Sequence, residues 1–286
     1  MKSGSFPVAG GRRIAYNIYG DAGHFPVAFF HGLGGSRNSI TVDEAWLRQK
    51  RWSLVSFDRP GVGDSGALPA YTLEQVAADA AALIAHLGHQ RCAALGWSAG
   101  GPFAMAFAGG FPELVDFLAL VNTAMPVGDG KGGWWPAGSR QWLALACRYL
   151  PALANPFFYL AARRYRRNPK LALARAIARM APADRELLQS PAMQALLRQA
   201  SDDAWGSGGY GPACDARALG HRLAVRLDDV RIPVHLWQGE QDIDSGTCRL
   251  EKLARRFPKA TIHRVKQAGH LLYLQHAEKI LEISLW

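Results

Sequence analysis

The segment 95–101 reads Leu-Gly-Trp-Ser-Ala-Gly-Gly and constrains the fold more than any other stretch of the chain. It follows a strand-like run over 91–96, and it precedes Pro102, which suits the first turn of a helix because its missing N–H is not needed there. The segment therefore fits Gly-x-Ser-x-Gly at a strand-to-helix turn, where small residues on either side of Ser98 let the two elements pack closely. A bare match to this motif often arises by chance, but the strand and helix on the correct sides make this one informative.

The first 125 residues alternate between strand and helix patterns. Alternation of apolar and polar residues over 12–19 predicts an edge or hairpin strand. A helical stripe begins after Thr72, with Gln75 at the capping-box position, and ends at Gly88. Strand, helix and strand at this spacing predict parallel pairing. Short apolar runs predict buried strands at 27–30, 52–57, 91–96 and 116–121.

The pattern changes at residue 126. The stretch 126–225 is rich in Trp, Arg, Ala and Leu and shows helical rather than strand signals. Strands then return at 233–238 and 260–265, with a helix capped by Ser245 or Thr247 that runs through Phe257 and another over 274–286. We therefore predict one α/β core, 1–125 with 226–286, interrupted by a helical insertion over 126–225.

Composition excludes several protein classes. The chain has 286 residues, 49% of them hydrophobic and 20% charged, and a mean hydropathy of −0.07. These values exclude a disordered, collagen-like or coiled-coil chain. No uncharged apolar run reaches the length of about 18 residues that a membrane span needs, and no signal peptide is visible. Four widely spaced cysteines argue against a disulfide framework and a structural zinc site, so we expect a cytoplasmic protein.

Positive charge is concentrated in the predicted insertion. The net charge is +10, and 126–225 holds 14 Lys and Arg against 6 Asp and Glu, or +8. The densest run, 163–167, is interpreted as a solvated helix face, because Leu171, Leu173, Ala174 and Ile177 interleave as a buried side would. Contact with an anionic membrane surface is a minor alternative. Nucleic-acid binding is not expected, because the positive charge is the only feature of the sequence that supports it.

Together these features resemble the α/β-hydrolase superfamily, in its serine-nucleophile branch of esterases and aminopeptidases with a helical cap. The resemblance covers the whole chain and implies a mostly parallel eight-stranded sheet flanked by helices, with 126–225 as the cap. It implies Ser98 as the nucleophile and His270, in the Gly-His pair after the last strand, as the base. Asp242, in the Gly-x-x-Asp loop after the seventh strand, becomes the candidate acid, and Asp244 is the alternative.

The resemblance also assigns the loop after the first buried strand, Phe30-His31-Gly32-Leu33-Gly34-Gly35. In the superfamily this loop donates one oxyanion-hole N–H, which by position is that of Leu33, and Ala99 donates the second. His31 resembles a residue that shapes the loop. Some members carry the acid after strand six, but Asn122 stands there and cannot ionise, which favours Asp242.

Other motifs limit the chemistry. Asp58 and Arg59 begin a turn that resembles the superfamily's Asp-x-x-Gly-x-Gly-x-Ser, and we interpret them as turn residues and an ion pair that brace the elbow. Dehalogenases and epoxide hydrolases of this fold use an aspartate where this chain has Ser98. Proline iminopeptidases bind the substrate amine through cap carboxylates, for which this chain offers only Glu186 and the pair 202–203.

We therefore expect a serine hydrolase that cleaves carboxylic esters of small to medium, apolar acyl groups through an acyl-enzyme, with a small-molecule substrate and no cofactor or metal. The alternatives are the same triad in a proline iminopeptidase or amidase, a thioesterase or a C–C bond hydrolase, and a non-catalytic receptor. The pocket is expected to be mostly apolar and to lie under the cap. Its candidate residues are His31, Gly32, Trp97, Trp134, Trp135 and Trp142.

Overall fold

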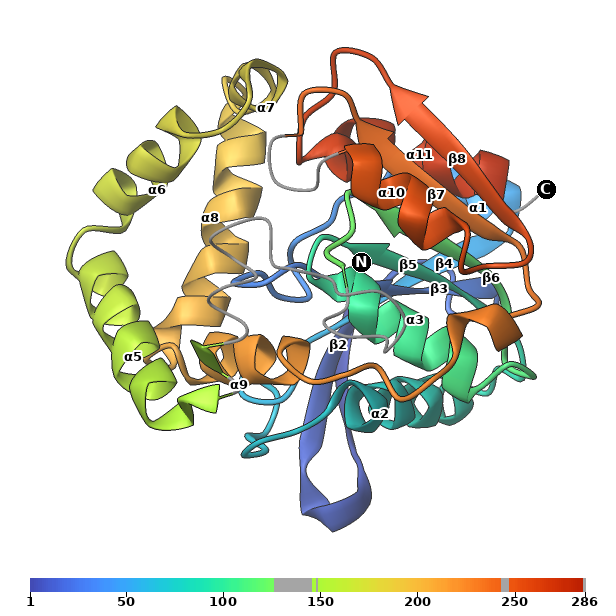
Figure 1. Ribbon diagram of the computed structural model, residues 1–286, viewed down its shortest axis with the longest axis horizontal. Coiled ribbons are helices and arrows are strands. Elements are labelled where there is room, and N and C mark those ends of the chain that lie inside the picture. The colour runs from blue at the N-terminus through green and yellow to red at the C-terminus, as the bar shows by residue number, and fades with distance from the viewer. Residues whose placement is uncertain (126–145, 148, 243–246, 285–286) are drawn as a thin grey trace.

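The computed structural model describes residues 1–125, 146–147, 149–242 and 247–284 (Figure 1). Its centre is an eight-stranded sheet with the strand order β1-β2-β4-β3-β5-β6-β7-β8. The first two pairings in that order are antiparallel and the remaining five are parallel. The strands are β1 (Lys2–Pro7), β2 (Arg13–Gly20), β3 (Phe25–Phe30), β4 (Trp52–Phe57), β5 (Cys92–Trp97), β6 (Val115–Val121), β7 (Val234–Gly239) and β8 (Ala260–Val265).

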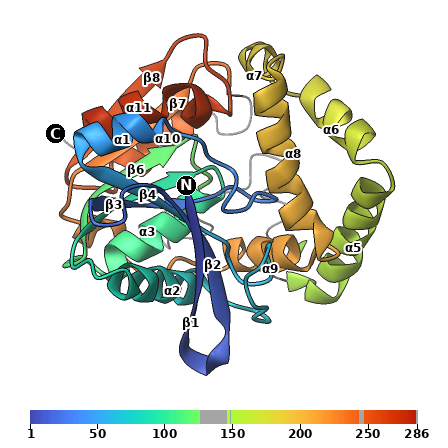
Figure 2. The ribbon, with the colours of Figure 1, turned by 180° about the vertical axis from the view of Figure 1, so that it is seen from behind.

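Helices cover both faces of the sheet, as Figures 1 and 2 show from opposite sides. The helices α2 (Leu73–His86), α3 (Gly100–Gly110) and α10 (Thr247–Ala254) contribute to one buried apolar cluster, and α1 (Glu44–Lys50) and α11 (Leu272–Ser284) contribute to the other. Along β3, Val27 and Phe29 join one cluster while Ala28 and Phe30 join the other. Both faces of the central strands are therefore apolar, which explains their continuous apolar runs.

The described chain between β6 and β7 is mostly helical from residue 151 to residue 219 and contains five α-helices there. Four of its five helices begin with proline, a residue preorganised for the first helical position. Figures 1 and 2 show α5 to α8 beside the sheet rather than over one of its faces. The five helices are α5 (Pro151–Arg167), α6 (Pro169–Ala178), α7 (Pro182–Leu187), α8 (Pro191–Gly206) and α9 (Tyr210–Leu219).

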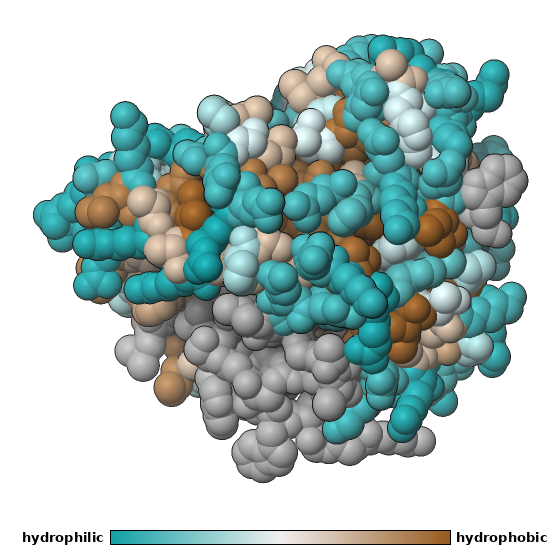
Figure 3. Space-filling model, turned by 90° about the horizontal axis from the view of Figure 1, so that it is seen from above, coloured by the Kyte–Doolittle hydropathy of each residue, from teal (hydrophilic) through white to brown (hydrophobic). Residues whose placement is uncertain are grey.

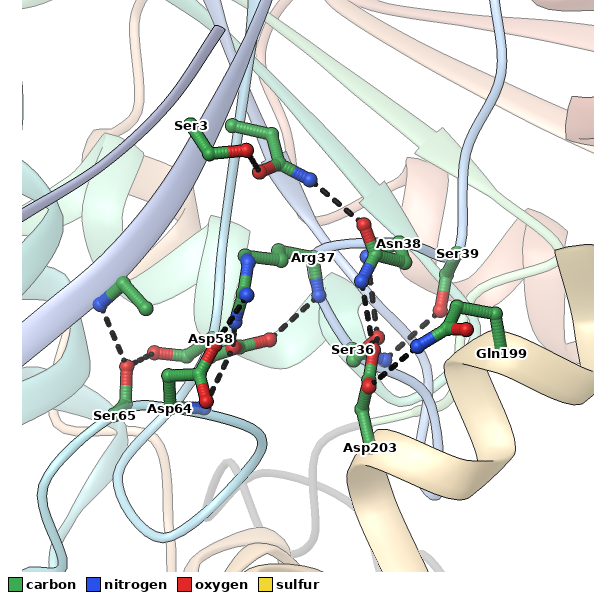
Figure 4. A network of polar contacts seen from close by, with 12 residues as sticks. Ser3, Ser36, Arg37, Asn38, Ser39, Asp58, Asp64, Ser65, Gln199 and Asp203 are labelled. Carbon is green, nitrogen blue, oxygen red and sulfur yellow. Dashed lines mark hydrogen bonds and ion pairs between the residues drawn. The ribbon is translucent and has the colours of Figure 1, made fainter. Parts of the chain in front are cut away.

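A polar network joins α8 to the core (Figure 4). Asp203 on α8 accepts hydrogen bonds from Ser36 Oγ and Asn38 Nδ2, both at 2.8 Å, and from Gln199 within the same helix at 2.9 Å. The carbonyl oxygen of Asp203 also accepts from the amide of Gly63 at 3.2 Å. A carboxylate with this many donors fixes α8 against the loop that follows β3.

Most predicted elements lie where expected. Each predicted strand overlaps an observed one, and α2 has its capping box: Thr72 Oγ1 accepts from the Gln75 amide at 3.2 Å, and Gln75 Oε1 accepts from the Thr72 amide at 2.9 Å. The structure adds β1, which has only Phe6 buried and so lacks an apolar pattern, and the short helix α1. The helix predicted to run through Phe257 ends at Ala254, and Ser245 lies outside the described residues. Two short 3-10 helices cover Ala9–Gly11 and Leu227–Asp229.

The interpretation of 163–179 needs one correction. The basic run is exposed as expected, but the predicted buried side of the next helix is wrong: α6 buries none of its residues, and Leu171 is exposed. The reason is that the main contacts of α6 are with α5, α7 and α8, and its residues Leu173 and Ile177 line an open groove of about 650 Å³ against α8.

Most of the large apolar side chains that are exposed in the described residues lie on the insertion. Figure 3 shows hydrophobic and hydrophilic residues interspersed on the side of the molecule that the insertion forms. The minor alternative of contact with an anionic membrane depends on this surface and stays untested. Within the described ranges, none of the helices combines the length and the hydropathy that crossing a bilayer requires. Exposed large apolar side chains here are Tyr149, Leu150, Phe157, Tyr159, Leu160 and Leu171.

Candidate active site

Ser98 lies on the sharp turn between β5 and α3. Its φ of 53° is in the left-handed region, which is strained for a residue with a side chain. Neighbouring glycines make the turn possible. A Cβ on Gly96 would lie 2.8 Å from Ala104 Cβ, and one on Gly100 would overlap the carbonyl oxygen of Phe30. The small residues expected on either side of Ser98 are therefore required by the close approach of strand and helix.

Three residues distant in sequence meet at this turn. Ser98 Oγ and His270 Nε2 are 2.9 Å apart, and His270 Nδ1 and Asp242 Oδ1 are 3.1 Å apart. Asp242 follows β7 and His270 follows β8, so all three residues stand just beyond the carboxyl ends of parallel strands. The Asp242 side chain is fully buried, whereas that of His270 is 16% exposed. Asp244, the alternative acid, lies outside the described residues.

Asn122 connects the loops that carry Asp242 and His270. Its side-chain amide donates to the carbonyl oxygens of Gly269 at 2.8 Å and His270 at 3.1 Å, and its Oδ1 accepts from the Gly239 amide at 2.9 Å. Trp97 Nε1 donates to the same His270 carbonyl at 2.9 Å. The sequence indicated only that Asn122 is not an acid. Its positive φ of 44° and its cross-links appear only in the folded chain.

The Asp242 carboxylate is held by its own loop. Gln238 Nε2 donates to Asp242 Oδ2 at 3.2 Å, and the Asp242 amide donates to the Gly239 carbonyl at 3.1 Å. A Cβ on Gly239 would overlap the carbonyl oxygen of Ala268, so glycine is needed where the acid loop crosses the histidine loop. One carboxylate oxygen therefore contacts His270, and the other contacts Gln238.

The loop after β3 lies against the elbow, since a Cβ on Gly100 would overlap the carbonyl oxygen of Phe30 and lie 2.7 Å from that of His31. Between described residues, the backbone N–H groups of Leu33 and Ala99 donate no hydrogen bond. His31 is fully buried, with Nδ1 2.9 Å from the Gly32 carbonyl oxygen. Burial lowers the pKa of His31 well below its usual value, and the charge of Arg59 lowers it further. His31 is therefore a neutral, buried residue of this loop.

The arrangement is that of a known family. The alpha/beta hydrolase fold family matches residues 26–277, which is most of the chain. The chain belongs to the alpha/beta hydrolase fold family. This confirms the resemblance and the fold class expected from the sequence.

Relatives of this α/β hydrolase include an esterase and a lipase. The chain is 31% identical over 121 residues to sn-1-specific diacylglycerol lipase ABHD11 of Mus musculus, covering 42% of this chain and 39% of the relative. It is 29% identical over 195 residues to pimeloyl-(acyl-carrier protein) methyl ester esterase of Aromatoleum aromaticum, covering 64% and 68%. The chain spans about two fifths of the length of the first curated relatives it matches.

A solved structure agrees on the fold. A thermophilic esterase from Thermogutta terrifontis superposes with a TM-score of 0.71 at 22% identity, covering 99% of this chain and 96% of that one. At this identity the likeness concerns the fold alone.

The predicted pocket residues of this α/β hydrolase lie as follows. Trp97 is 8% exposed and stacks on Tyr273 with ring centroids 4.3 Å apart. Gly32 lies against the Trp97 indole, since an added Cβ would be 2.7 Å from Cζ3. Trp205 on α8 reaches the same loop, because a Cβ on Gly34 would lie 3.2 Å from its indole. Trp134, Trp135 and Trp142 lie outside the described residues.

The expected ion pair of Asp58 with Arg59 is wrong. Asp58 instead pairs with Arg37 of the loop after β3, and Arg59 pairs with Asp215 on α9. Successive residues of this turn point to different sides, so each carboxylate and guanidinium finds a partner from another segment. Arg59 also donates to the carbonyl oxygens of His31 at 2.6 Å and Gly32 at 3.2 Å, so it braces the loop of Leu33 rather than the elbow.

One functional candidate was missed altogether. Asp184 on α7 is 2% exposed, and its two carboxylate oxygens accept from the amides of His270 and Leu271. No sequence motif marks it, because its partners are backbone groups distant in the chain. Within the described ranges, no group of three or more His, Cys, Asp or Glu side chains is arranged to hold a metal ion.

Proposed function

We propose that this α/β hydrolase cleaves carboxylic esters of small to medium, apolar acyl groups through a covalent acyl-enzyme. The observation that carries the proposal is the hydrogen-bonded chain from Ser98 through His270 to Asp242. A serine hydroxyl is a poor nucleophile until a base takes its proton, and a carboxylate keeps that base in the required tautomer. Relatives named as an esterase and a lipase support an ester as the substrate class.

In this mechanism His270 takes the hydroxyl proton while Ser98 Oγ attacks the ester carbonyl carbon. The resulting oxyanion accepts hydrogen bonds from the amides of Leu33 and Ala99. The bond to the alcohol breaks, and His270 returns its proton to the leaving alkoxide. A water molecule then gives a proton to His270 and attacks the acyl carbon. The bond to Oγ breaks, Ser98 regains a proton from His270, and the carboxylic acid leaves.

An apolar acyl group suits the aromatic side chains near the elbow. Trp97 precedes the nucleophile, and Trp205 lies against the loop of Leu33. Apolar walls with a few oriented polar groups are the usual make-up of a small-molecule site. These contacts support an acyl group without charge.

The carboxylates of the insertion that could bind a substrate amine are already hydrogen-bonded or exposed, which argues against an aminopeptidase. Asp202 accepts from Tyr165 and Arg198, and Asp203 accepts from Ser36 and Asn38. A carboxylate already engaged by two donors must lose them before it binds an ammonium group. The remaining candidate, Glu186, is exposed. An ester therefore remains the preferred substrate.

The experiment is hydrolysis of p-nitrophenyl esters from acetate to decanoate by the parent protein and by Ser98→Ala. The variant should fold normally and lose at least about a thousandfold in kcat/KM. Ser190→Ala is the matched control, because the Ser190 side chain makes no capping hydrogen bond at the start of α8. The chain-length optimum of the parent measures the depth of the acyl pocket.

A fluorophosphonate probe separates the remaining functions. Labelling of Ser98 without turnover of any ester would replace the ester proposal with amide, thioester or C–C bond cleavage. Absence of both labelling and turnover would favour a non-catalytic receptor. A cytoplasmic location belongs to this proposal, supported by the three buried, unpaired cysteines Cys92, Cys147 and Cys214.

A further inference from the structure

Helix α7 of the insertion contacts both loops that carry the candidate base and acid. Asp184 Oδ2 accepts from the His270 amide and Asp184 Oδ1 accepts from the Leu271 amide, each at 2.8 Å. The preceding residue, Ala183, donates its amide to Gln241 Oε1 at 3.0 Å. Gln241 stands directly before Asp242. A helix of six residues therefore binds the acid loop and the histidine loop at the same time.

This contact is buried and closely fitted. The Asp184 carboxyl group lies so near Gly269 that a Cβ there would overlap it. Leu188, which follows α7, belongs to the same buried apolar cluster as Leu271. Burial raises the pKa of Asp184, against the effect of the two amides that it binds. Because a buried carboxylate is costly unless its oxygens are used, both hydrogen bonds are needed to keep it there.

The backbone of His270 is thus held on both sides. Its amide is bound by Asp184, and its carbonyl oxygen is bound by Asn122 and Trp97. With the backbone fixed, only the two side-chain torsions of His270 remain to be set by Asp242 and Ser98. The insertion supplies one of these restraints, although the triad candidates all belong to the core.

We propose that Asp184 is a positioning residue for His270, so that seating of α7 on the core aligns the base between Asp242 and Ser98. The inference rests on the proposed function, because it concerns the same base. It makes the insertion part of the catalytic machinery. Loss of the two hydrogen bonds to Asp184, here called the clamp, leaves the substrate contacts in place. It lets the His270 imidazole move away from Ser98 and Asp242, and such misplacement lowers kcat more than it raises KM.

The test compares Asp184→Asn with Asp202→Asn. The first variant keeps the shape of the side chain but turns an amide NH₂ toward one of two N–H donors, so one hydrogen bond is lost. The second makes the same change of charge at a carboxylate of the insertion whose partners, Tyr165 and Arg198, also belong to the insertion. We expect kcat on p-nitrophenyl esters to fall at least about tenfold in Asp184→Asn, with KM within about twofold of the parent. Asp202→Asn should match the parent in both constants.

Two further readouts do not depend on turnover. Hydrogen exchange of the His270 and Leu271 amides should be faster in Asp184→Asn than in Asp202→Asn. The NMR resonance of the His270 Nδ1 proton should be sharp in the parent and broadened in Asp184→Asn. A purely structural role predicts a lower melting temperature with this resonance and kcat unchanged, and that result overturns the inference.

The outcomes separate the two proposals. If the parent hydrolyses esters and Asp184→Asn keeps the parental kcat, the positioning role is wrong and the hydrolase proposal stands. If the parent hydrolyses no ester, the ester proposal fails, and the Nδ1 resonance alone supports or overturns the clamp. If Asp184→Asn does not fold, the variant Gln241→Ala takes its place, since it removes only the hydrogen bond from the Ala183 amide to Gln241 Oε1. Its kcat should then fall about threefold, and a parental kcat overturns the inference.

Discussion

Arg59 and Asp215 form a fully buried ion pair between a turn of the core and helix α9. The guanidinium donates through Nε and Nη2 to the two carboxylate oxygens, each at 2.6 Å, and neither side chain is exposed. Tyr71 donates its hydroxyl to the same carboxylate. The remaining guanidinium donors reach the loop before Leu33. This pair therefore links the insertion side of the molecule to the candidate oxyanion loop.

Removing one partner of this pair should destabilise the protein strongly. Asp215→Asn leaves the Arg59 charge buried without its counterion, and we expect a loss of about 3–5 kcal/mol in the free energy of unfolding, measured by urea denaturation. The matched control is Asp229→Asn. The Asp229 side chain is 64% exposed and that of its partner Arg226 is 72% exposed, so loss of this pair should lower the free energy of unfolding by less than about 1 kcal/mol. Equal losses in the two variants would contradict the prediction. If Asp215→Asn does not fold, the double variant Arg59→Met with Asp215→Leu should restore folding, because it leaves no unpaired charge.

Asn122 should be needed for both stability and turnover. Asn122→Asp replaces an N–H donor by an oxygen that faces the carbonyl oxygens of Gly269 and His270, so two hydrogen bonds become repulsive contacts. We expect a loss of about 2 kcal/mol or more in unfolding free energy, together with a lower kcat on p-nitrophenyl esters. Asn38→Asp changes the same chemical group in the loop after β3 and serves as the comparison for kcat. A kcat of Asn122→Asp at the parental value would show that the cross-link does not orient His270.

Asp58 should make stability depend on pH. Burial raises the pKa of Asp58 to about 6, against the charge and hydrogen bonds of Arg37. The unfolded chain has the ordinary value, so between pH 4 and pH 6 the folded state binds the extra proton. The free energy of unfolding should therefore fall as pH rises through this window, by about 3 kcal/mol from this group.

Denaturation curves of the parent and of Asp58→Asn between pH 4 and pH 7 measure this contribution. The variant should lack the fall, because an amide does not titrate. Asp64→Asn is the control, since Asp64 also pairs with Arg37 but has a side chain that is 77% exposed. A variant that keeps the parental pH dependence would refute the assignment to Asp58.

Glycine at position 100 should be indispensable. In Gly100→Ala the new Cβ overlaps the backbone oxygen of Phe30, which cannot move without displacing β3. We expect a loss of about 3 kcal/mol in the free energy of unfolding. Gly110→Ala at the other end of α3 is the control, because its Cβ meets nothing within 4 Å. That control should be neutral or stabilising by up to about 1 kcal/mol. Thermal unfolding should therefore show a lower melting temperature for Gly100→Ala and an unchanged or higher one for Gly110→Ala.

Local signals account for what could be predicted. Short apolar runs marked β3, β4, β5 and β6, because strands covered on both faces need mostly apolar side chains. Thr72 and Gln75 marked the start of α2, because a capping box is read within four residues. The strand β1 was missed because its pairing with β2, not its own residues, makes it a strand.

The sequence by itself determined the alternation of strands and helices, the strained serine turn and the order of the three triad candidates. These features depend on the spacing of residues along the chain and on glycines next to Ser98, and both can be read from residues that are close together in the sequence. Only the tertiary structure decided that Asp58 pairs with Arg37, that Asn122 joins two loops, and that Asp184 binds the His270 backbone. Such contacts join groups far apart in sequence, and many of the partners are backbone atoms that every residue carries. A buried carboxylate must find a donor, but which donor it finds is set by where the packed sheet and insertion bring the chain together.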